Sequence, residues 1–371
     1  MTEYIVIGAG ILGASTAYHL AKSGVHVTVI DRQDAGRATD AAAGIICPWL
    51  SQRRNKAWYA LAKNGAAYYE TLIEHLKEDG ETETGYKKVG TISLHTDKNK
   101  LLKMEERAVE RRVDAPEIGT IRQLTQNETT LAFPLLSEEY RSVHVSGAAR
   151  VNGRALRQAL VNAAKKNGAT FILGSAEIKH ADLCVSGVQV GDVHYPADCV
   201  IVTAGAWADE LLSPLELNLQ LTAQKAQIVH LQLENKDTGD WPVVMPPNDQ
   251  YILSFENGQI VIGATHEDHM NFDMRVTAGG LHEVFDKALS VAPGLSDSTF
   301  VETRVGYRPF TPNFLPIIGA VPGYKGLLLA NGLGASGLTV GPFLGAQLAK
   351  LAKEETLDID LNLYNVEGAL K

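Results

Sequence analysis

Three glycines near the N-terminus form the most informative chemical motif of the sequence. Gly8, Gly10 and Gly13 have the spacing G-x-G-x-x-G, between a short apolar run and helical periodicity over 11–23. The first glycine permits a tight turn, the second lets a pyrophosphate approach the backbone, and the third lets the helix pack on the strand. Free N–H groups at the start of such a helix bind phosphate. Because Asp31 closes the next apolar run, where a ribose-binding acid is expected, the unit predicts a dinucleotide site.

Composition limits the kind of protein that carries this motif. The chain has 371 residues, of which 45% are hydrophobic and 21% charged, so we expect two or three globular domains. Its net charge of -9 gives no general nucleic-acid-binding surface. The three cysteines, Cys47, Cys184 and Cys199, are widely spaced and form no C-x-x-C pair. We therefore expect a cytoplasmic protein without a disulfide scaffold or a cysteine zinc site.

Two uncharged stretches have to be considered as membrane spans. Residues 4–21 are short and interrupted by glycine and polar residues, and residues 326–349 contain six glycines and a proline. A glycine-rich loop is not tolerated in the hydrocarbon region of a bilayer. The N-terminus also lacks the basic segment of a signal peptide. Both stretches are better explained as a strand, a glycine turn and a helix.

Strand and helix patterns alternate along the chain. Helical periodicity predicts helices over 56–78, 98–113, 153–167 and 342–353. Apolar runs predict strands over 25–30, 89–95, 169–173, 200–203, 219–233, 250–265 and 326–330, with a hairpin turn at Asn257 and Gly258. Short apolar strands that alternate with helices are typical of a parallel sheet, so the fold class is α/β.

Six segments, in their order along the chain, resemble the D-amino-acid oxidase (DAO) family of FAD-dependent oxidoreductases. Within that family the resemblance is greatest to the glycine oxidase and D-amino-acid dehydrogenase branch, and it covers nearly the whole chain. The segments are the N-terminal glycine unit, 38–45, 151–156, 202–208, 260–265, and 306–309 together with 315–319. The resemblance implies a Rossmann-like FAD-binding domain and a second domain built on an antiparallel sheet that roofs the flavin.

The resemblance also implies which residues bind FAD. They are Gly8, Gly10, Ile11, Leu12 and Gly13 at the phosphates, Asp31 and Arg32 at the ribose, Ala38, Thr39, Ala43, Gly44 and Ile45 along the flavin, Glu177 near the adenine, Ala204 and Gly205, and Leu333, Gly334, Ala335, Ser336, Gly337, Leu338 and Thr339 at the pyrimidine edge. Because the C-terminal third has no cysteine, we expect noncovalent FAD. A helix that opens near Pro342 would point its positive end at the flavin. The alternative is that these late glycines only pack a helix on a sheet.

Two residues are assigned to the substrate by the same resemblance. Arg308 matches the arginine that pairs with an amino-acid carboxylate, because a planar guanidinium donates two parallel hydrogen bonds. Tyr251 matches a tyrosine that supports the carboxylate or closes the site. The alternatives are a surface arginine and a tyrosine that packs on the core. Leu333 and Ala335 replace a histidine and an arginine of glycine oxidases, which leaves the exact substrate and electron acceptor open.

The function implied by the resemblance is FAD-dependent oxidative deamination. The substrate is a small amino acid or secondary amine of the glycine, sarcosine or D-amino-acid type, and hydride transfer from its Cα to flavin N5 gives an imine. Oxygen or another electron acceptor reoxidises the flavin, and a homo-oligomer is one expectation for the assembly. An NAD-dependent dehydrogenase and a non-catalytic flavin-binding module are the alternatives.

We expect the FAD-binding domain to be discontinuous, formed by 1–85, 142–215 and 300–371. Residues 86–141 and 216–299 then form the substrate-binding domain. No metal site is expected, because the run from His266 to His269 lacks the H-E-x-x-H spacing of a zinc motif. His266 can instead line the opening of the substrate pocket.

Overall fold

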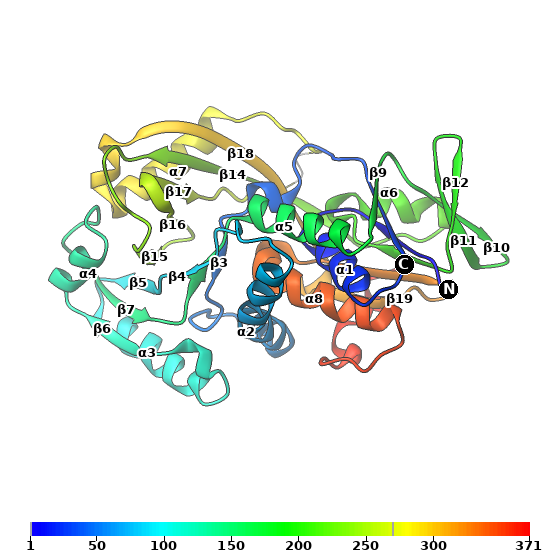
Figure 1. Ribbon diagram of the computed structural model, residues 1–371. Helices are drawn as coiled ribbons and strands as arrows, with labels where there is room; N and C mark the ends of the chain where they lie inside the picture. The colour runs from blue at the N-terminus through cyan, green and yellow to red at the C-terminus, as the bar shows by residue number, and fades with distance from the viewer. Residues whose placement is uncertain (1, 269–270) are drawn as a thin grey trace.

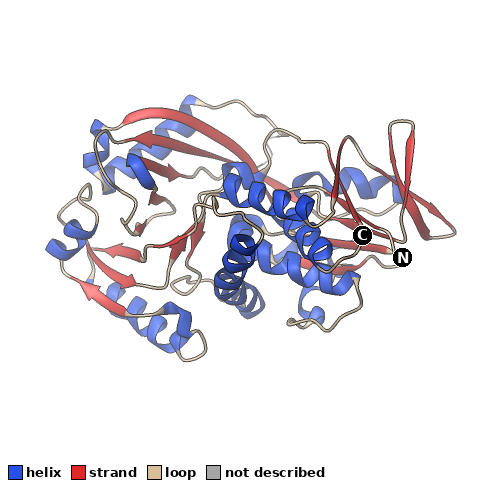
Figure 2. Ribbon diagram, in the orientation of Figure 1, coloured by secondary structure: helices blue, strands red, loops and turns tan. Residues whose placement is uncertain are grey.

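The protein is described by a computed structural model that covers residues 2–268 and 271–371. It has two lobes, one around a mainly parallel sheet and the other around a larger, mainly antiparallel sheet (Figure 1). The long strands β14 (Thr222–Gln232) and β18 (Thr299–Phe310) pair with each other and extend toward the parallel sheet. Figure 2 shows several helices gathered where the two lobes meet. The α/β fold class predicted from the sequence is confirmed.

The first lobe is built on a six-stranded sheet. In pairing order its strands are β19 (Ile317–Ala320), β20 (Leu327–Asn331), β13 (Cys199–Val202), β1 (Tyr4–Ile7), β2 (Val27–Asp31) and β9 (Thr170–Leu173). All neighbours are parallel except β19 and β20. The strand order runs in one direction from β1 through β2 and in the other through β13, so the sheet has a topological switch point between β1 and β13. In open α/β sheets, ligands bind at the carboxyl ends of the strands at this point.

Helices cover one face of this sheet in a single packed group. The group consists of α1 (Ile11–Lys22), α2 (Lys56–Glu78), α5 (Gly153–Lys166) and α8 (Gly337–Ala352). Helix α1 packs against α5 and α8, and α8 packs against α2. Nearly every residue of α1 and α8 is buried. The two uncharged stretches of the sequence are therefore core strand–turn–helix units. Among the described residues, we find no helix with the combined length and apolar character that a bilayer crossing requires.

Helix α8 begins five residues earlier than the sequence pattern predicts. The predicted start at Pro342 is wrong, because the helix begins at Gly337 and Pro342 lies inside it. A proline inside a helix has no N–H for the carbonyl four residues earlier. That carbonyl belongs to Leu338, and the hydroxyl of Tyr69 on α2 donates a hydrogen bond to it. The neighbouring helix thus satisfies the group that the proline leaves free.

The Tyr69 hydroxyl is expected to stabilise the fold measurably. Changing Tyr69→Phe leaves the buried Leu338 carbonyl without a partner, which costs about 1–3 kcal/mol in the free energy of unfolding. Urea unfolding of the two proteins measures this difference. Tyr59→Phe on the same helix is the matched control, because the Tyr59 hydroxyl is buried without a hydrogen-bond partner among the described residues. Equal losses in both variants would contradict the assignment.

The second lobe is built on an eight-stranded sheet. In pairing order its strands are β18, β14, β17 (Gln259–Gly263), β16 (Tyr251–Ser254), β15 (Val243–Met245), β5 (Thr91–His95), β7 (Arg141–Val145) and β6 (Ile121–Leu124). The pairs are antiparallel except β15 and β5, which are parallel. Helices α3 (Lys98–Arg112), α4 (Gln126–Ala132) and α7 (Ala278–Val291) pack against this sheet. The turn predicted at Asn257 and Gly258 connects β16 to β17.

Smaller elements complete the fold. A meander of β10 (Glu177–Ala181), β11 (Cys184–Val190) and β12 (Val193–Pro196) forms a separate antiparallel sheet. A second small sheet pairs β8 (Ala149–Arg150) with β3 (Ile45–Ile46) and β4 (Lys87–Lys88), and the short helix α6 (Ala208–Leu212) follows β13. The sequence patterns did not predict these short elements.

Candidate functional site

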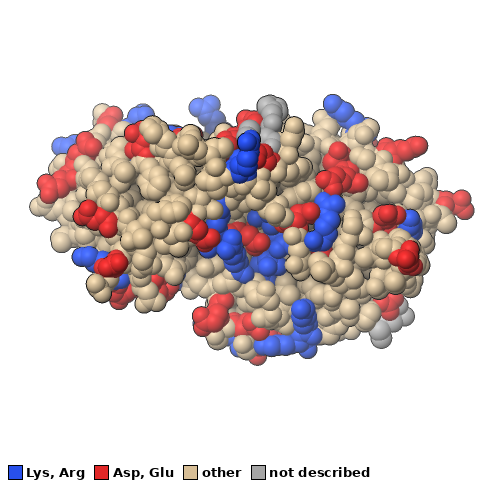
Figure 3. Space-filling model, turned by 90° about the horizontal axis from the view of Figure 1, so that it is seen from above, with Lys and Arg blue, Asp and Glu red and all other residues tan. Residues whose placement is uncertain are grey.

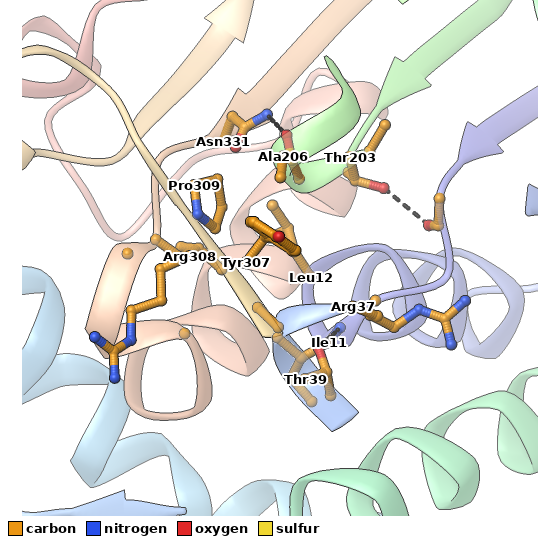
Figure 4. Close-up of a pocket in the computed structure, with 18 of the residues that line it drawn as sticks. Ile11, Leu12, Arg37, Thr39, Thr203, Ala206, Tyr307, Arg308, Pro309 and Asn331 are labelled. Atoms are coloured by element: carbon orange, nitrogen blue, oxygen red, sulfur yellow. Dashed lines mark hydrogen bonds between the residues drawn. The ribbon is translucent and has the colours of Figure 1, made fainter. Parts of the chain in front are cut away.

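One large cavity of about 900 Å³ runs from the carboxyl ends of the parallel strands to the eight-stranded sheet. Of the residues predicted to bind FAD or substrate, all line this cavity except Gly13. Figure 4 shows part of its wall, with the side chains of Arg37 and Arg308 pointing in opposite directions. The tertiary structure therefore brings together residues that are separated by more than 300 positions in the sequence.

The glycine turn lies at the switch point of the parallel sheet. Gly8 follows β1 with a φ of 98°, which a residue with a side chain rarely adopts. A Cβ at Gly8 would lie 2.8 Å from the carbonyl oxygen of Thr203, which follows β13. The Thr203 hydroxyl also donates to the Gly8 carbonyl at 3.0 Å. Glycine is thus required where the ends of β1 and β13 come together.

The start of helix α1 has the properties of a phosphate site. Its first residues have N–H groups without intrahelical partners, and Gly10 provides no side-chain cap. The Ile11 N–H donates to the Thr39 hydroxyl at 3.0 Å. A Cβ at Gly10 would meet only that hydroxyl, at 3.7 Å, so the space beside Gly10 is open. This open helix terminus, where Thr39 accepts one of the N–H groups, fits a pyrophosphate.

Gly13 has a different role from Gly10. A Cβ at Gly13 would lie 1.8 Å from the Gly8 carbonyl oxygen and 2.4 Å from the Thr203 hydroxyl. The third glycine therefore lets α1 pack directly on the turn, as the motif predicts, and it does not face the cavity.

Asp31 is the last residue of β2, where the sequence predicts the ribose-binding acid. Both of its carboxylate oxygens accept hydrogen bonds from other residues of the protein. Oδ2 accepts the Ala9 N–H, and Oδ1 accepts the Gln33 N–H at 2.7 Å and the Arg37 guanidinium at 2.6 Å. Arg32 forms ion pairs with other acids near the cavity. Arg37, which the sequence interpretation missed, therefore stands beside the predicted ribose-binding acid. It lies two residues before Thr39, immediately before the segment 38–45 that carried the resemblance.

Positive side chains gather in a hollow on the face seen in Figure 3. Next to the main cavity, a smaller cavity of about 460 Å³ is lined by Arg37, Arg154, Arg157 and Arg304. Nearby acids balance most of this charge. Asp40 lies 3.4 Å from both Arg37 and Arg157, and Glu302 pairs with Arg304.

Two loops meet at the predicted flavin end of the cavity. The Thr339 hydroxyl donates to the Ile45 carbonyl at 2.9 Å, and the indole N–H of Trp58 donates to the Ser336 hydroxyl at 2.9 Å. The first bond joins segment 38–45 to segment 333–339, and the second joins helix α2 to segment 333–339. The positive end of α8 is at Gly337, which lines the cavity. Trp58 was not predicted as a site residue, because it matches the buried face of a helix equally well.

Arg308 lies on β18, at the end of the cavity where the sequence predicts the substrate. Its Nη1 donates to the Gln224 side chain at 3.1 Å, directly across the strand pair, and to the Thr265 carbonyl at 3.4 Å. No carboxylate lies within 4 Å of this guanidinium among residues 2–268 and 271–371. Burial lowers the pKa of Arg308, although arginine stays charged at neutral pH. The site thus holds a cation that has neutral partners only, as a carboxylate-binding site requires.

Tyr251 extends toward Arg308 across the two intervening strands, β17 and β14. It begins β16 and pairs with Gly263 of β17, where a Cβ would lie 3.0 Å from the Tyr251 hydroxyl. Because Gly263 has no side chain, the tyrosine can extend over it toward β18. Burial raises the pKa of Tyr251 to about 12, and the charge of Arg308 opposes this rise. The hydroxyl therefore stays protonated at neutral pH and can donate to a carboxylate.

A buried polar network fixes the segment after β17. Lys225, which is fully buried, donates to the Arg275 carbonyl at 2.7 Å and lies 3.8 Å from Glu267. The backbones of Lys225 and Glu267 exchange two hydrogen bonds, of 2.8 and 2.9 Å. This network holds Thr265 and His266 beside Arg308, and His266 lines the cavity.

No group of three or more histidines, cysteines or acids with metal-binding geometry occurs within the described part of the chain. His269, the last residue of the run weighed as a metal motif, lies outside the described residues.

Gly10 is expected to control cofactor affinity without affecting the fold. An alanine at position 10 fits the apoprotein, because the backbone there is extended and the nearest atom is 3.7 Å away. Its methyl group would occupy the space that the pyrophosphate needs. We expect Gly10→Ala to raise the Kd for FAD at least tenfold and to change apoprotein stability by less than about 1 kcal/mol. Flavin fluorescence titration and urea unfolding measure the two effects, and unchanged FAD affinity would contradict this role.

The chain was compared with known proteins. Residues 3–351 match the family model described as DAO, FAD dependent oxidoreductase. The chain is 63% identical over 371 residues to the oxidoreductase YurR of Bacillus subtilis (strain 168), covering 100% of both chains. It is 30% identical over 374 residues to the glycine oxidase of Pseudomonas aeruginosa, covering 99% of both chains. The crystal structure of iminodiacetate oxidase from Chelativorans sp. BNC1 superposes with a TM-score of 0.95, at 45% identity over 98% of both chains.

These similarities decide between the cofactors that the glycine motif left open. The match extends from the phosphate turn to the last turns of α8, and it includes both ends of the cavity. The open helix terminus, the switch point and the long cavity are the features that an FAD molecule needs. The predictions of an enzyme and of noncovalently bound FAD, rather than NAD, are therefore confirmed. The chain belongs to the DAO family of FAD-dependent oxidoreductases.

Proposed function

We propose that this enzyme oxidises the CH–NH bond of a small amino acid or secondary amine that carries a carboxylate. The observation that carries the proposal is Arg308, a cavity-lining guanidinium without a carboxylate partner among the described residues, with the Tyr251 hydroxyl beside it. The names of the glycine oxidase and iminodiacetate oxidase relatives support this substrate class. In both names the substrate is a small amine with at least one carboxylate.

The residues act by binding and orientation. Arg308 and Tyr251 hold the substrate carboxylate, which fixes the position of the adjacent Cα in the cavity. When bound, FAD supplies the two-electron acceptor for the Cα–H bond. The substrate would thereby lose a hydride and become an iminium ion, which water would hydrolyse to a carbonyl compound and an amine. In this scheme the neutral amine provides the electron pair, so no side-chain base is required.

We also propose the division of the chain between cofactor and substrate. Residues 1–85, 142–215 and 300–371 hold FAD, and residues 86–141 and 216–299 form the substrate-binding domain. Strands of the parallel sheet all fall within the first set, which supports the proposal. Arg308 belongs to the first set in sequence, but its strand pairs with β14 of the second.

Anaerobic reduction of the bound flavin tests the proposed function. The purified yellow protein is mixed without oxygen with glycine, sarcosine, iminodiacetate, proline or D-alanine, and absorbance near the flavin maximum is followed. We expect at least one of these amines to bleach the flavin. Failure of all of them, while dithionite still bleaches it, would overturn the proposal. Admitting oxygen afterwards distinguishes an oxidase, which is rapidly reoxidised, from a dehydrogenase.

A further inference from the structure

His266 is a cavity-lining side chain to which the proposed function gives no role. It follows Thr265, whose carbonyl accepts a hydrogen bond from Arg308, and it precedes Glu267, whose backbone is bound to Lys225 on both sides. The position of His266 next to Arg308 is therefore fixed by the sheet. Its side chain is 41% exposed, so a ligand in the cavity can contact it.

The acidic groups around His266 are each paired with a basic or amide group, so a further anion can bind beside the imidazole. Its Nδ1 lies 3.7 Å from Asp249, and Lys287 compensates that carboxylate at 2.8 Å while also pairing with Glu283. Glu267 lies against Lys225, and Asp268 accepts from the Gln224 amide. The Nε2 atom of His266 has no hydrogen-bond partner among residues 2–268 and 271–371. Arg308 thus has no anionic partner among these residues, and the Nε2 side of the adjacent imidazole is available to a second anion.

We propose that His266 binds a second carboxylate of the substrate, so that the enzyme is built for a secondary amine with two carboxylates, of the iminodiacetate class. This inference rests on the proposed function, because Arg308 has to hold the first carboxylate. The similarity to an iminodiacetate oxidase over 98% of the chain supports this class. A substrate with one carboxylate would leave the imidazole unused.

The protonation of His266 gives this site a pH dependence of known sign. Burial and the nearby charge of Arg308 lower the pKa of His266, so the ring is neutral in the empty cavity at neutral pH. A second carboxylate beside the ring favours the imidazolium form and raises that pKa. Binding of a dicarboxylate therefore takes up a proton, and it strengthens as the pH falls through the raised pKa of the complex toward the lower pKa of the empty site. A ligand with one carboxylate lacks this contribution.

Binding of two non-oxidisable analogues to the FAD-loaded enzyme tests the proposal. Diglycolate has two carboxylates and an ether in place of the amine, and its monoamide has the same shape with one carboxylate. Their Kd values are measured by calorimetry between pH 6 and pH 8, where neither analogue titrates. We expect diglycolate to bind about tenfold more tightly than the monoamide at pH 6.5, with the ratio increasing as the pH falls.

Two substitutions at position 266 separate the charge from the hydrogen bond. His266→Leu should bring the ratio of the two Kd values close to one, whereas His266→Gln should keep part of the preference and lose its pH dependence. His282→Leu is the matched control, because His282 is exposed on α7 and does not line the cavity, and it should keep the wild-type ratio. If the leucine variant does not fold, the pH profile of the glutamine variant decides.

A wild-type ratio that persists in His266→Leu, or a pH dependence that persists in His266→Gln, would overturn the assignment. These outcomes are distinct from a failure of the proposed function. If sarcosine bleaches the flavin but diglycolate binds no better than its monoamide, the enzyme oxidises amines and only the second carboxylate site is wrong. If no amine bleaches the flavin, the proposed function itself fails.

Discussion

Replacing Arg308 with alanine is expected to lower kcat/KM at least 100-fold for every carboxylate-bearing amine that the enzyme oxidises. Loss of a buried charged partner costs about 2–5 kcal/mol in comparable pairs. Among residues 2–268 and 271–371, Arg308 donates to neutral groups, the Gln224 side chain and the Thr265 carbonyl, and to no carboxylate. Its charge is therefore available to the substrate. Stopped-flow reduction of the flavin at varied substrate concentration measures the loss in the binding and reduction steps.

Two further variants make this result specific. Arg308→Lys keeps the charge and loses the planar fork, so it should recover only part of the activity. Arg304→Ala removes an arginine from the same strand, where it pairs with Glu302 at the smaller cavity, and it should leave turnover near the wild-type value. Normal turnover of an amino acid by Arg308→Ala would refute the role of Arg308. An equal loss in Arg304→Ala would indicate a general effect on β18.

Gly13→Ala is expected to destabilise the protein by about 3 kcal/mol and to prevent it from retaining FAD. The new methyl group would lie 1.8 Å from the Gly8 carbonyl oxygen and 2.4 Å from the Thr203 hydroxyl, both closer than any contact allows. Helix α1 would have to move away from the turn, and overpacking of this kind costs about 1–3 kcal/mol or more. Urea unfolding and the ratio of flavin to protein absorbance measure the two losses.

Gly279→Ala is the matched control for this substitution. Gly279 also lies in a helix, and a Cβ there meets no atom within 4 Å. Alanine has a higher helix propensity than glycine, so the control should be neutral or more stable by up to about 1 kcal/mol. If Gly13→Ala is as stable as this control and stays yellow, α1 does not need the close packing that the glycine permits.

Local motifs were predicted well because short segments contain them completely. The unit from β1 to β2 occupies residues 4–31, and its turn, helix and acid lie where the pattern places them. Pro342 shows the limit of such patterns. A proline suggests a helix start when only its neighbours are considered, and the helix starts earlier because Tyr69, 269 positions away from Leu338, satisfies the carbonyl that the proline leaves free.

The sequence by itself determined the phosphate turn and the family. The glycine spacing is a property of neighbouring residues, and the order of the six segments is a property of the linear chain, so neither requires knowledge of tertiary contacts. The sequence also singled out Arg308, through a motif of four residues. The tertiary structure alone decided which groups surround that arginine. Gln224 is opposite it on the neighbouring strand β14, Tyr251 extends toward it past Gly263, and His266 is held beside it by the network around Lys225. These contacts join strands distant in sequence, so they follow from the pairing register of the sheet, which no local pattern specifies.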